Sequence, residues 1–177
     1  MAALPRAIGP RLAAGLVGLM AAATIAGALA SQHVFGLVPC KLCLDQRVPY
    51  YFGVPFAAVL ALAPLPGPWL RAGLGLLALV FLVSAGLGAY HAGVEWGAWP
   101  GPADCGGGVP AAGTVADFLR SLETVRVVSC ADAAWRFLGL SLAGWNALVS
   151  LALAGGAAVG AAAPRSDQGS SSVSQYR

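Results

Sequence analysis

Two cysteines separated by two residues, Cys40 and Cys43, are the residues whose types and spacing most directly suggest chemistry. Thiols at this spacing can close a tight disulfide, and Pro39 immediately before them suits the first turn of a helix. A thiol at a helix N-terminus faces the positive end of the helix dipole, which favours the thiolate. If that helix continues, Arg47 lies one turn after Cys43 on the same face. The pattern therefore predicts a redox-active Cys-x-x-Cys pair beside a positive charge.

The composition is that of a membrane protein. Hydrophobic residues make up 58% of the 177 residues, charged residues 10%, and the mean hydropathy is +0.76. This is far more apolar than a soluble domain of the same size. The net charge of +3 comes from scattered arginines rather than from a clustered basic face, so we expect a lipid bilayer as partner and no nucleic acid.

Long apolar stretches predict an all-α fold, a four-helix transmembrane bundle that forms one domain over residues 1–177. The expected spans are residues 12–31, 48–65, 72–90 and 138–163. Residues 165–177 are rich in serine and are expected to form a disordered tail. The first stretch also fits a cleaved signal peptide, because it has a basic start and the small-residue site Ala28-Leu29-Ala30. That alternative changes only the helix count.

All four cysteines fall in two loops on one side of the predicted bundle, residues 32–47 and 91–137. Basic residues are equally numerous on the two sides, so the orientation depends on the cysteines. Disulfide chemistry fits an oxidising face, which would be the periplasm of a Gram-negative bacterium. In the second loop, Thr114 and Asp117 form a capping-box pattern. The apolar face that follows predicts a short amphipathic helix, which either lies flat on the membrane or packs on the bundle ends.

The order of these features resembles that of disulfide bond formation protein B (DsbB). The resemblance runs from about Gln32 to Trp145 and includes the four-span layout. The residues that carry it are Pro39-Cys40-Lys41-Leu42-Cys43, Arg47, His91, Cys105, the segment Cys130-Ala131-Asp132-Ala133-Ala134-Trp135-Arg136-Phe137-Leu138-Gly139-Leu140, and Trp145. It is specific because both cysteine pairs, the arginine and the Phe-Leu-Gly-Leu entry to the last span occur in the right order. Asp45-Gln46 before the arginine differs from some members.

The resemblance implies a quinone-dependent protein-disulfide oxidoreductase of the bacterial inner membrane, with its redox loops facing the periplasm. By the resemblance, Cys105 and Cys130 accept electrons from a DsbA-type thioredoxin-fold oxidase, and Cys105 takes the mixed disulfide. Cys40 then joins Cys130 transiently. This leaves Cys43 as a thiolate beside a bound quinone, either ubiquinone or menaquinone.

The resemblance also assigns two residues to the quinone. Arg47 would stabilise negative charge on the Cys43 thiolate or on the reduced quinone, and His91 would lie near the quinone ring. Each has a simpler interpretation. An arginine at the end of a span commonly anchors the chain to lipid headgroups, and a histidine there commonly packs at the interface.

Other interpretations of the cysteines remain open. A quinone reductase of the vitamin K epoxide reductase type also sets a Cys-x-x-Cys beside a four-helix bundle, although in that family the pair typically belongs to a later span. A non-enzymatic membrane protein with two structural disulfides is a further alternative. A zinc site is disfavoured because 24 residues separate Cys105 from Cys130, whereas zinc sites usually pair two short spacings. We therefore expect no metal.

Overall fold

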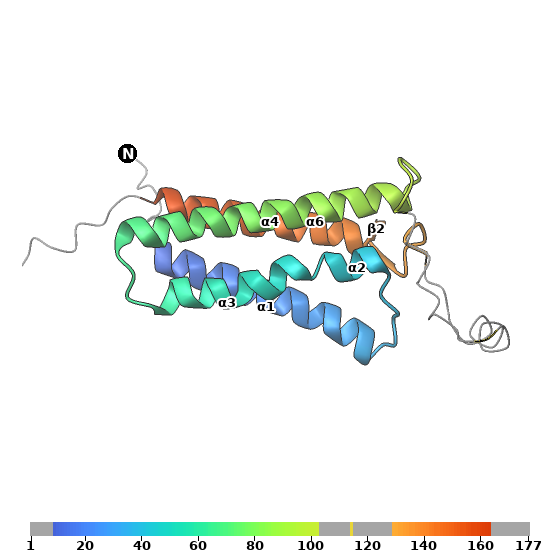
Figure 1. Ribbon diagram of the computed structural model, residues 1–177, viewed down its shortest axis with the longest axis horizontal. Coiled ribbons are helices and arrows are strands. Elements are labelled where there is room, and N and C mark those ends of the chain that lie inside the picture. The colour runs from blue at the N-terminus through green and yellow to red at the C-terminus, as the bar shows by residue number, and fades with distance from the viewer. Residues whose placement is uncertain (1–8, 103–113, 115–128, 164–177) are drawn as a thin grey trace, which may run out of the picture.

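Long antiparallel helices make up most of the computed structural model, which describes residues 9–102, 114 and 129–163. In chain order the elements are α1 (Pro10–His33), α2 (Lys41–Asp45), α3 (Val48–Leu62), α4 (Gly67–Glu95), β1 (Arg136–Phe137), β2 (Leu140–Ser141) and α6 (Leu142–Ala162). The long helices alternate in direction along one axis (Figure 1). The turn between α3 and α4 therefore lies at one end of the bundle, and α2 and the β1–β2 hairpin lie at the other.

The predicted all-α fold class is confirmed. Helices α1, α4 and α6 are each long and apolar enough to cross a membrane. Helix α3 is shorter, with 15 residues, and begins at Val48 as expected but ends at Leu62 instead of continuing to residue 65. The next residue, Ala63, is extended (ψ 145°) because it precedes Pro64, whose ring disfavours a helical conformation at the residue before it.

Helix α4 is longer than the span expected over residues 72–90. It begins at Gly67, with Pro68 in its first turn, and continues to Glu95. Proline suits the first turn because its missing N–H has no partner there in any case. The extension at the other end places His91 inside the helix, whereas it was expected in the second loop.

The last helix begins at Leu142, four residues later than the span expected from residue 138. The preceding residues form an antiparallel hairpin in which Arg136 pairs with Ser141 and Phe137 with Leu140. Its two turn residues, Leu138 and Gly139, have φ of 51° and 81°, the conformation of a tight two-residue hairpin turn. The Ser141 hydroxyl then accepts the Gly144 N–H at 3.2 Å and caps the helix.

Some expectations fall outside the residues that the structure describes. They are the amphipathic helix of the second loop, apart from Thr114, and the tail over residues 165–177.

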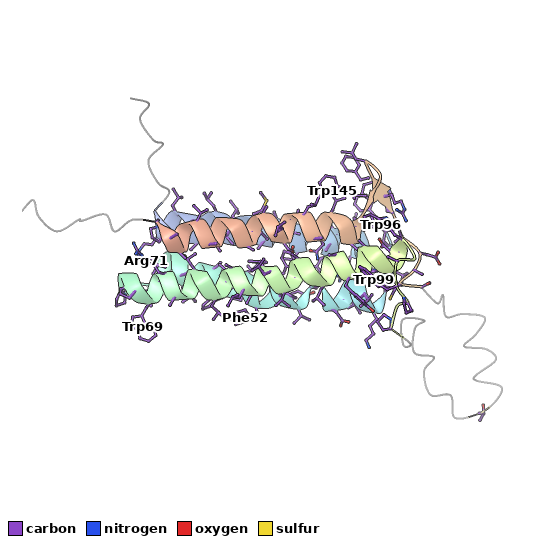
Figure 2. The ribbon with its side chains drawn as sticks, turned by 90° about the horizontal axis from the view of Figure 1, so that it is seen from above. Phe52, Trp69, Arg71, Trp96, Trp99 and Trp145 are labelled. Carbon is purple, nitrogen blue, oxygen red and sulfur yellow. The ribbon has the colours of Figure 1, made fainter. Side chains whose placement is uncertain are left out.

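Aromatic side chains gather at both ends of the bundle. Trp96, Trp99 and Trp145 are found at the end that carries the hairpin, and Trp69 and Arg71 at the opposite end (Figure 2). Trp69 and Trp96 are exposed over 71% and 61% of their surface. Tryptophan at both ends of an apolar bundle is typical of the two membrane–water interfaces.

Small residues allow α4 and α6 to pack closely. A Cβ added to Gly88 of α4 would lie 2.8 Å from the backbone nitrogen of Ala147 and 3.0 Å from the carbonyl oxygen of Ala143, both on α6. These are backbone atoms, which cannot move aside without moving the helix. The contact between α4 and α6 therefore requires glycine at position 88.

We expect Gly88→Ala to destabilise the bundle by about 1–3 kcal/mol, because the extra methyl group forces α4 and α6 apart. The measurement is thermal unfolding of the detergent-solubilised protein, followed by circular dichroism. Gly86→Ala is the matched control, since a Cβ at Gly86 meets nothing within 4 Å. Equal unfolding temperatures for the two variants would contradict the close packing.

Candidate active site

The Cys-x-x-Cys pair opens the short helix α2, as the proline before it predicted. Cys40 is the N-cap residue, and its sulfur accepts the backbone N–H of Cys43 at 3.3 Å. Both cysteines are free thiols, and their Sγ atoms lie 2.8 Å apart in a hydrogen bond. Cys40 is buried and Cys43 is half-buried. The pair is therefore in its reduced state, with one sulfur at the N-terminus of the helix.

The two thiols differ sharply in acidity. The hydrogen bond from the Cys43 thiol, together with those from His91 and from the Cys43 N–H, lowers the pKa of Cys40 to about 4 despite burial. That same hydrogen bond to Cys40, together with burial, raises the pKa of Cys43. In the reduced pair the thiolate therefore belongs to Cys40. The thiolate expected on Cys43 concerns a different state, in which Cys40 is bonded to Cys130.

Arg47 lies against α1 and not on a continuous helix with Cys43. Helix α2 ends at Asp45, and Arg47 is the N-cap residue of α3. Its guanidinium donates to Gln32 Oε1 at 2.6 Å and to the carbonyl oxygen of Ala28 at 3.3 Å. Only 8% of the residue is exposed. Gln46 and Arg47 keep helical dihedrals between α2 and α3, and both Cys43 and Arg47 line the cavity described below.

His91 lies in the last turns of α4, is 2% exposed and contacts the cysteine pair directly. Its Nε2 lies 3.6 Å from the Cys40 Sγ and 3.8 Å from Glu95 Oε1. Its Nδ1 lies 2.6 Å from the side-chain nitrogen of Gln46. His91 therefore reaches the cysteine pair because α4 continues beyond the span expected over residues 72–90.

Cys130 is brought to the same place from the second loop. It is 1% exposed and disulfide-bonded, while Cys105 lies outside the described residues. The Sγ atoms of Cys40 and Cys130 and one ring nitrogen of His91 all lie within 4.8 Å of one another. Such a group could in principle hold a metal ion, but a sulfur in a disulfide is not a thiolate ligand. The fold thus brings sulfur atoms from two separate loops close together.

A cavity of about 290 Å³ opens beside the pair. Its walls come from α1, the segment before α2, α2 itself, the start of α3, residues 129–134 and the facing ends of α4 and α6. The lining residues include Ile25, Ala28, Val38, Leu142 and Val149 among the apolar side chains, and Cys43, Arg47, Tyr50, His91, Glu95 and Asp132 among the polar ones. Ile25 lies about 9 Å deeper along α1 than Ser31, so the cavity reaches into the bundle. Apolar walls with a few polar groups are typical of small-molecule sites.

A set of buried polar side chains behind the cysteines was not predicted from the sequence. Gln46 was treated only as a departure from the family, and Tyr50, Glu95 and Asn146 were not singled out. Asn146 donates to Gln46 Oε1 at 2.7 Å and accepts the Tyr50 hydroxyl at 2.8 Å. The sequence does contain a sign of these buried polar residues, because Asn146 and Ser150 lie one helical turn apart in a stretch without charges.

Comparison with known proteins gives a concordant result. The family model for disulfide bond formation protein DsbB matches residues 10–160. Disulfide bond formation protein B of Marinobacter nauticus is 38% identical over 146 residues, which cover 76% of this chain and 81% of that protein. The protein of the same name from a Polaromonas species is 33% identical over 156 residues, covering 82% and 86%. No solved structure matches the chain significantly.

The difference in acidity predicts selective alkylation of the reduced pair. Since the pKa of Cys40 is about 4, its rate of reaction with iodoacetamide should stay constant from pH 8 down to pH 5 and fall only near pH 4. An ordinary thiol loses roughly tenfold per pH unit over the same range. Mass spectrometry of the labelled peptides distinguishes the two cysteines, and Cys43 should remain unlabelled at pH 6.

Cys43→Ala is the control for this measurement, because it removes the thiol that donates to Cys40. The Cys40 profile should then move to higher pH. Preferential labelling of Cys43 at pH 6 in the unsubstituted protein would contradict the assignment of the thiolate.

Proposed function

Since the chain belongs to the family of disulfide bond formation protein DsbB, we propose that it reoxidises a periplasmic DsbA-type dithiol oxidase and passes the electrons to a membrane quinone. Family membership and the three span-capable helices make it a multi-pass membrane protein with a role in disulfide formation. The partner, the quinone and the location in the inner membrane are parts of the proposal.

One observation carries this proposal: a reduced Cys40–Cys43 pair lies beside the disulfide-bonded Cys130, at the wall of an apolar cavity. The Cys40 and Cys130 sulfurs are within 4.8 Å of each other, so exchange between the two loops needs little movement. The cavity supports a second redox partner on the other side of the pair. A lone structural disulfide would require neither feature.

In the proposed cycle, a thiolate of the reduced partner attacks Cys105, forming a mixed disulfide and releasing the Cys130 thiolate. That thiolate attacks Cys40 of the oxidised pair, so a Cys40–Cys130 bond forms and Cys43 leaves as a thiolate. The second thiol of the partner then attacks the mixed disulfide. The partner departs oxidised, and Cys105 is released as a thiolate.

Attack of Cys105 on Cys130 restores the second-loop disulfide and leaves Cys40 and Cys43 reduced. The state seen here, with two free thiols and a disulfide-bonded Cys130, corresponds to this stage. A bound quinone would accept the two electrons and two protons as Cys40 and Cys43 close their disulfide. The pair is then ready for another cycle.

The energetics favour a strong terminal acceptor. A DsbA-type oxidase has a potential near about −120 mV, and an ER-like glutathione pool has one near about −200 mV. Passing two electrons from the oxidase to glutathione would therefore be uphill by about 3.7 kcal/mol. A quinone dissolved in the membrane is an acceptor of a suitable kind, and it can reach a site buried at the end of a helical bundle.

The cavity has the properties that a quinone ring requires. Its walls are mostly apolar, and its volume is near the lower end of the range for small-molecule sites. We assign Arg47 and His91 to the polar edge of the ring. The two terminal nitrogens of Arg47 each donate one hydrogen bond to α1, which leaves other guanidinium N–H groups for an oxygen in the cavity.

The proposal is tested with purified protein, a reduced thioredoxin-fold substrate and a soluble quinone analogue. We expect one quinone to be reduced for each dithiol oxidised, because each transfer moves two electrons. Cys40→Ser and Cys43→Ser should each abolish this turnover and leave the helical content unchanged. Near-normal turnover in either variant would mean that the pair is structural.

Arg47 provides a second prediction. Arg47→Lys keeps the charge but loses the planar fork, so we expect a higher KM for quinone with disulfide exchange to the partner largely intact. Arg47→Ala should raise the KM further. Gln32→Ala is the matched control, since it removes the strongest contact of Arg47 with α1 and keeps the charge. If Gln32→Ala reproduced the effect of Arg47→Ala, the role of Arg47 would be to hold α1.

A further inference from the structure

Gln46 lies at the centre of a buried hydrogen-bond chain that ends on Cys40. The residue is 7% exposed and follows α2 directly. Its side-chain nitrogen lies 3.2 Å from the carbonyl oxygen of Leu42 and 2.6 Å from His91 Nδ1. Its side-chain oxygen accepts the Asn146 amide at 2.7 Å. Every polar atom of the side chain is therefore engaged.

The backbone carbonyl fixes which way the Gln46 amide points. A carbonyl oxygen can only accept, so the amide atom facing Leu42 must be the nitrogen. An amide nitrogen carries two hydrogens, and the second is directed at His91 Nδ1. Asn146 supports the same orientation from the other side, because its nitrogen donates to Gln46 Oε1 while its oxygen accepts the Tyr50 hydroxyl.

The orientation of the amide decides the protonation of the imidazole. Because Nδ1 accepts from Gln46, it carries a lone pair, and the ring proton is on Nε2. Nε2 lies 3.6 Å from the Cys40 Sγ, within hydrogen-bond reach of a sulfur. In the other neutral tautomer a lone pair would face the sulfur and disfavour the thiolate.

We propose that Gln46, itself held by Asn146, is a positioning residue that fixes His91 as the Nε2–H tautomer and so directs its proton at the Cys40 sulfur. The hydrogen bonds from Tyr50 through Asn146, Gln46 and His91 are then all donated in one direction. Donors aligned in this way polarise one another, which strengthens the last bond of the chain. The last bond is the one made to Cys40.

Other ionisable groups face the same sulfur and the same ring. Glu95 Oε1 is 3.8 Å from His91 Nε2, and Glu95 Oε2 is buried with no hydrogen-bond partner among the described residues. Cys43 and Cys130 lie beside Cys40, and Arg47 and Asp132 line the cavity. A carboxylate next to Nε2 would also favour a proton there. Glu95 is therefore a competing cause of the Nε2–H tautomer, and the experiment must separate its effect from that of Gln46.

The consequence for exchange rests on the proposed function. In the proposed cycle, Cys105 attacks Cys130 and Cys40 leaves the Cys40–Cys130 disulfide as a thiolate, and a stabilised thiolate leaves faster. The tautomer itself does not depend on that proposal. It is a property of the reduced protein without partner or quinone, so failure of the inference and failure of the proposed function give different results.

The experiment is nitrogen NMR of the full chain, labelled with ¹⁵N-histidine, reduced and free of quinone. The chain has two histidines, and the other, His33, is exposed at the end of α1, so His33→Gln leaves one signal set to assign. At neutral pH we expect a pyrrole-type Nε2 and a pyridine-type Nδ1 for His91. A pyridine-type Nε2 or an imidazolium at His91, measured with Gln46 and Glu95 intact, would overturn the inference.

Variants then test the cause. Gln46→Met keeps the length of the side chain but removes both donors, so the fixed tautomer should be lost. The pH midpoint of Cys40 alkylation should rise by about one unit. Glu95→Gln should leave the tautomer unchanged. An unchanged tautomer in Gln46→Met, or its loss in Glu95→Gln alone, would assign the role to Glu95 and overturn the proposal.

Discussion

A sulfur anion buried at the end of an apolar bundle must be stabilised by hydrogen-bond donors, because little water reaches it. Cys40 is 6% exposed, and its donors come from separate parts of the chain. Cys43 supplies a thiol and a backbone N–H from α2, and His91 supplies a ring nitrogen from α4. Docking of α2 against α4 therefore adds the His91 donor to those that Cys43 already supplies to Cys40. The chemistry of the pair and the packing of the bundle depend on the same contacts.

The unequal lengths of the helices make this docking possible. Helix α4, with 29 residues, is about 43 Å long, which exceeds the roughly 30 Å of a hydrocarbon core. The helix is therefore long enough to extend past the core, and His91 and Glu95 lie in its last turns. Helix α3, with 15 residues, is only about 22 Å long, and α2 continues its path at the same end (Figure 1). The cysteine pair thus faces the projecting end of α4.

The sequence allowed the helical class, the meeting of the two loops at one end and the helix start at Cys40 to be predicted, since each depends on local patterns. Contacts between distant segments could not be predicted in this way. The hydrogen bond of His91 to Cys40 needs the extra turns of α4, and nothing in the periodicity of an apolar helix marks where it ends. The hydrogen bonds of Arg47 to Gln32 and Ala28 of α1 likewise join segments far apart in the sequence. The hairpin at Leu138 and Gly139 was missed because Leu rarely adopts a positive φ.

That hairpin also sets how far Cys130 can travel. Trp145 donates its ring N–H to the carbonyl oxygen of Phe137 at 3.0 Å, which ties the hairpin to the start of α6. Only residues 131–135 separate Cys130 from β1, so the sulfur can move no more than about 20 Å from that anchor. A short tether of this kind gives the attached group an effective concentration in the millimolar range. In the proposed cycle, a small soluble thiol would have to match that concentration to compete with the Cys130 thiolate for Cys40.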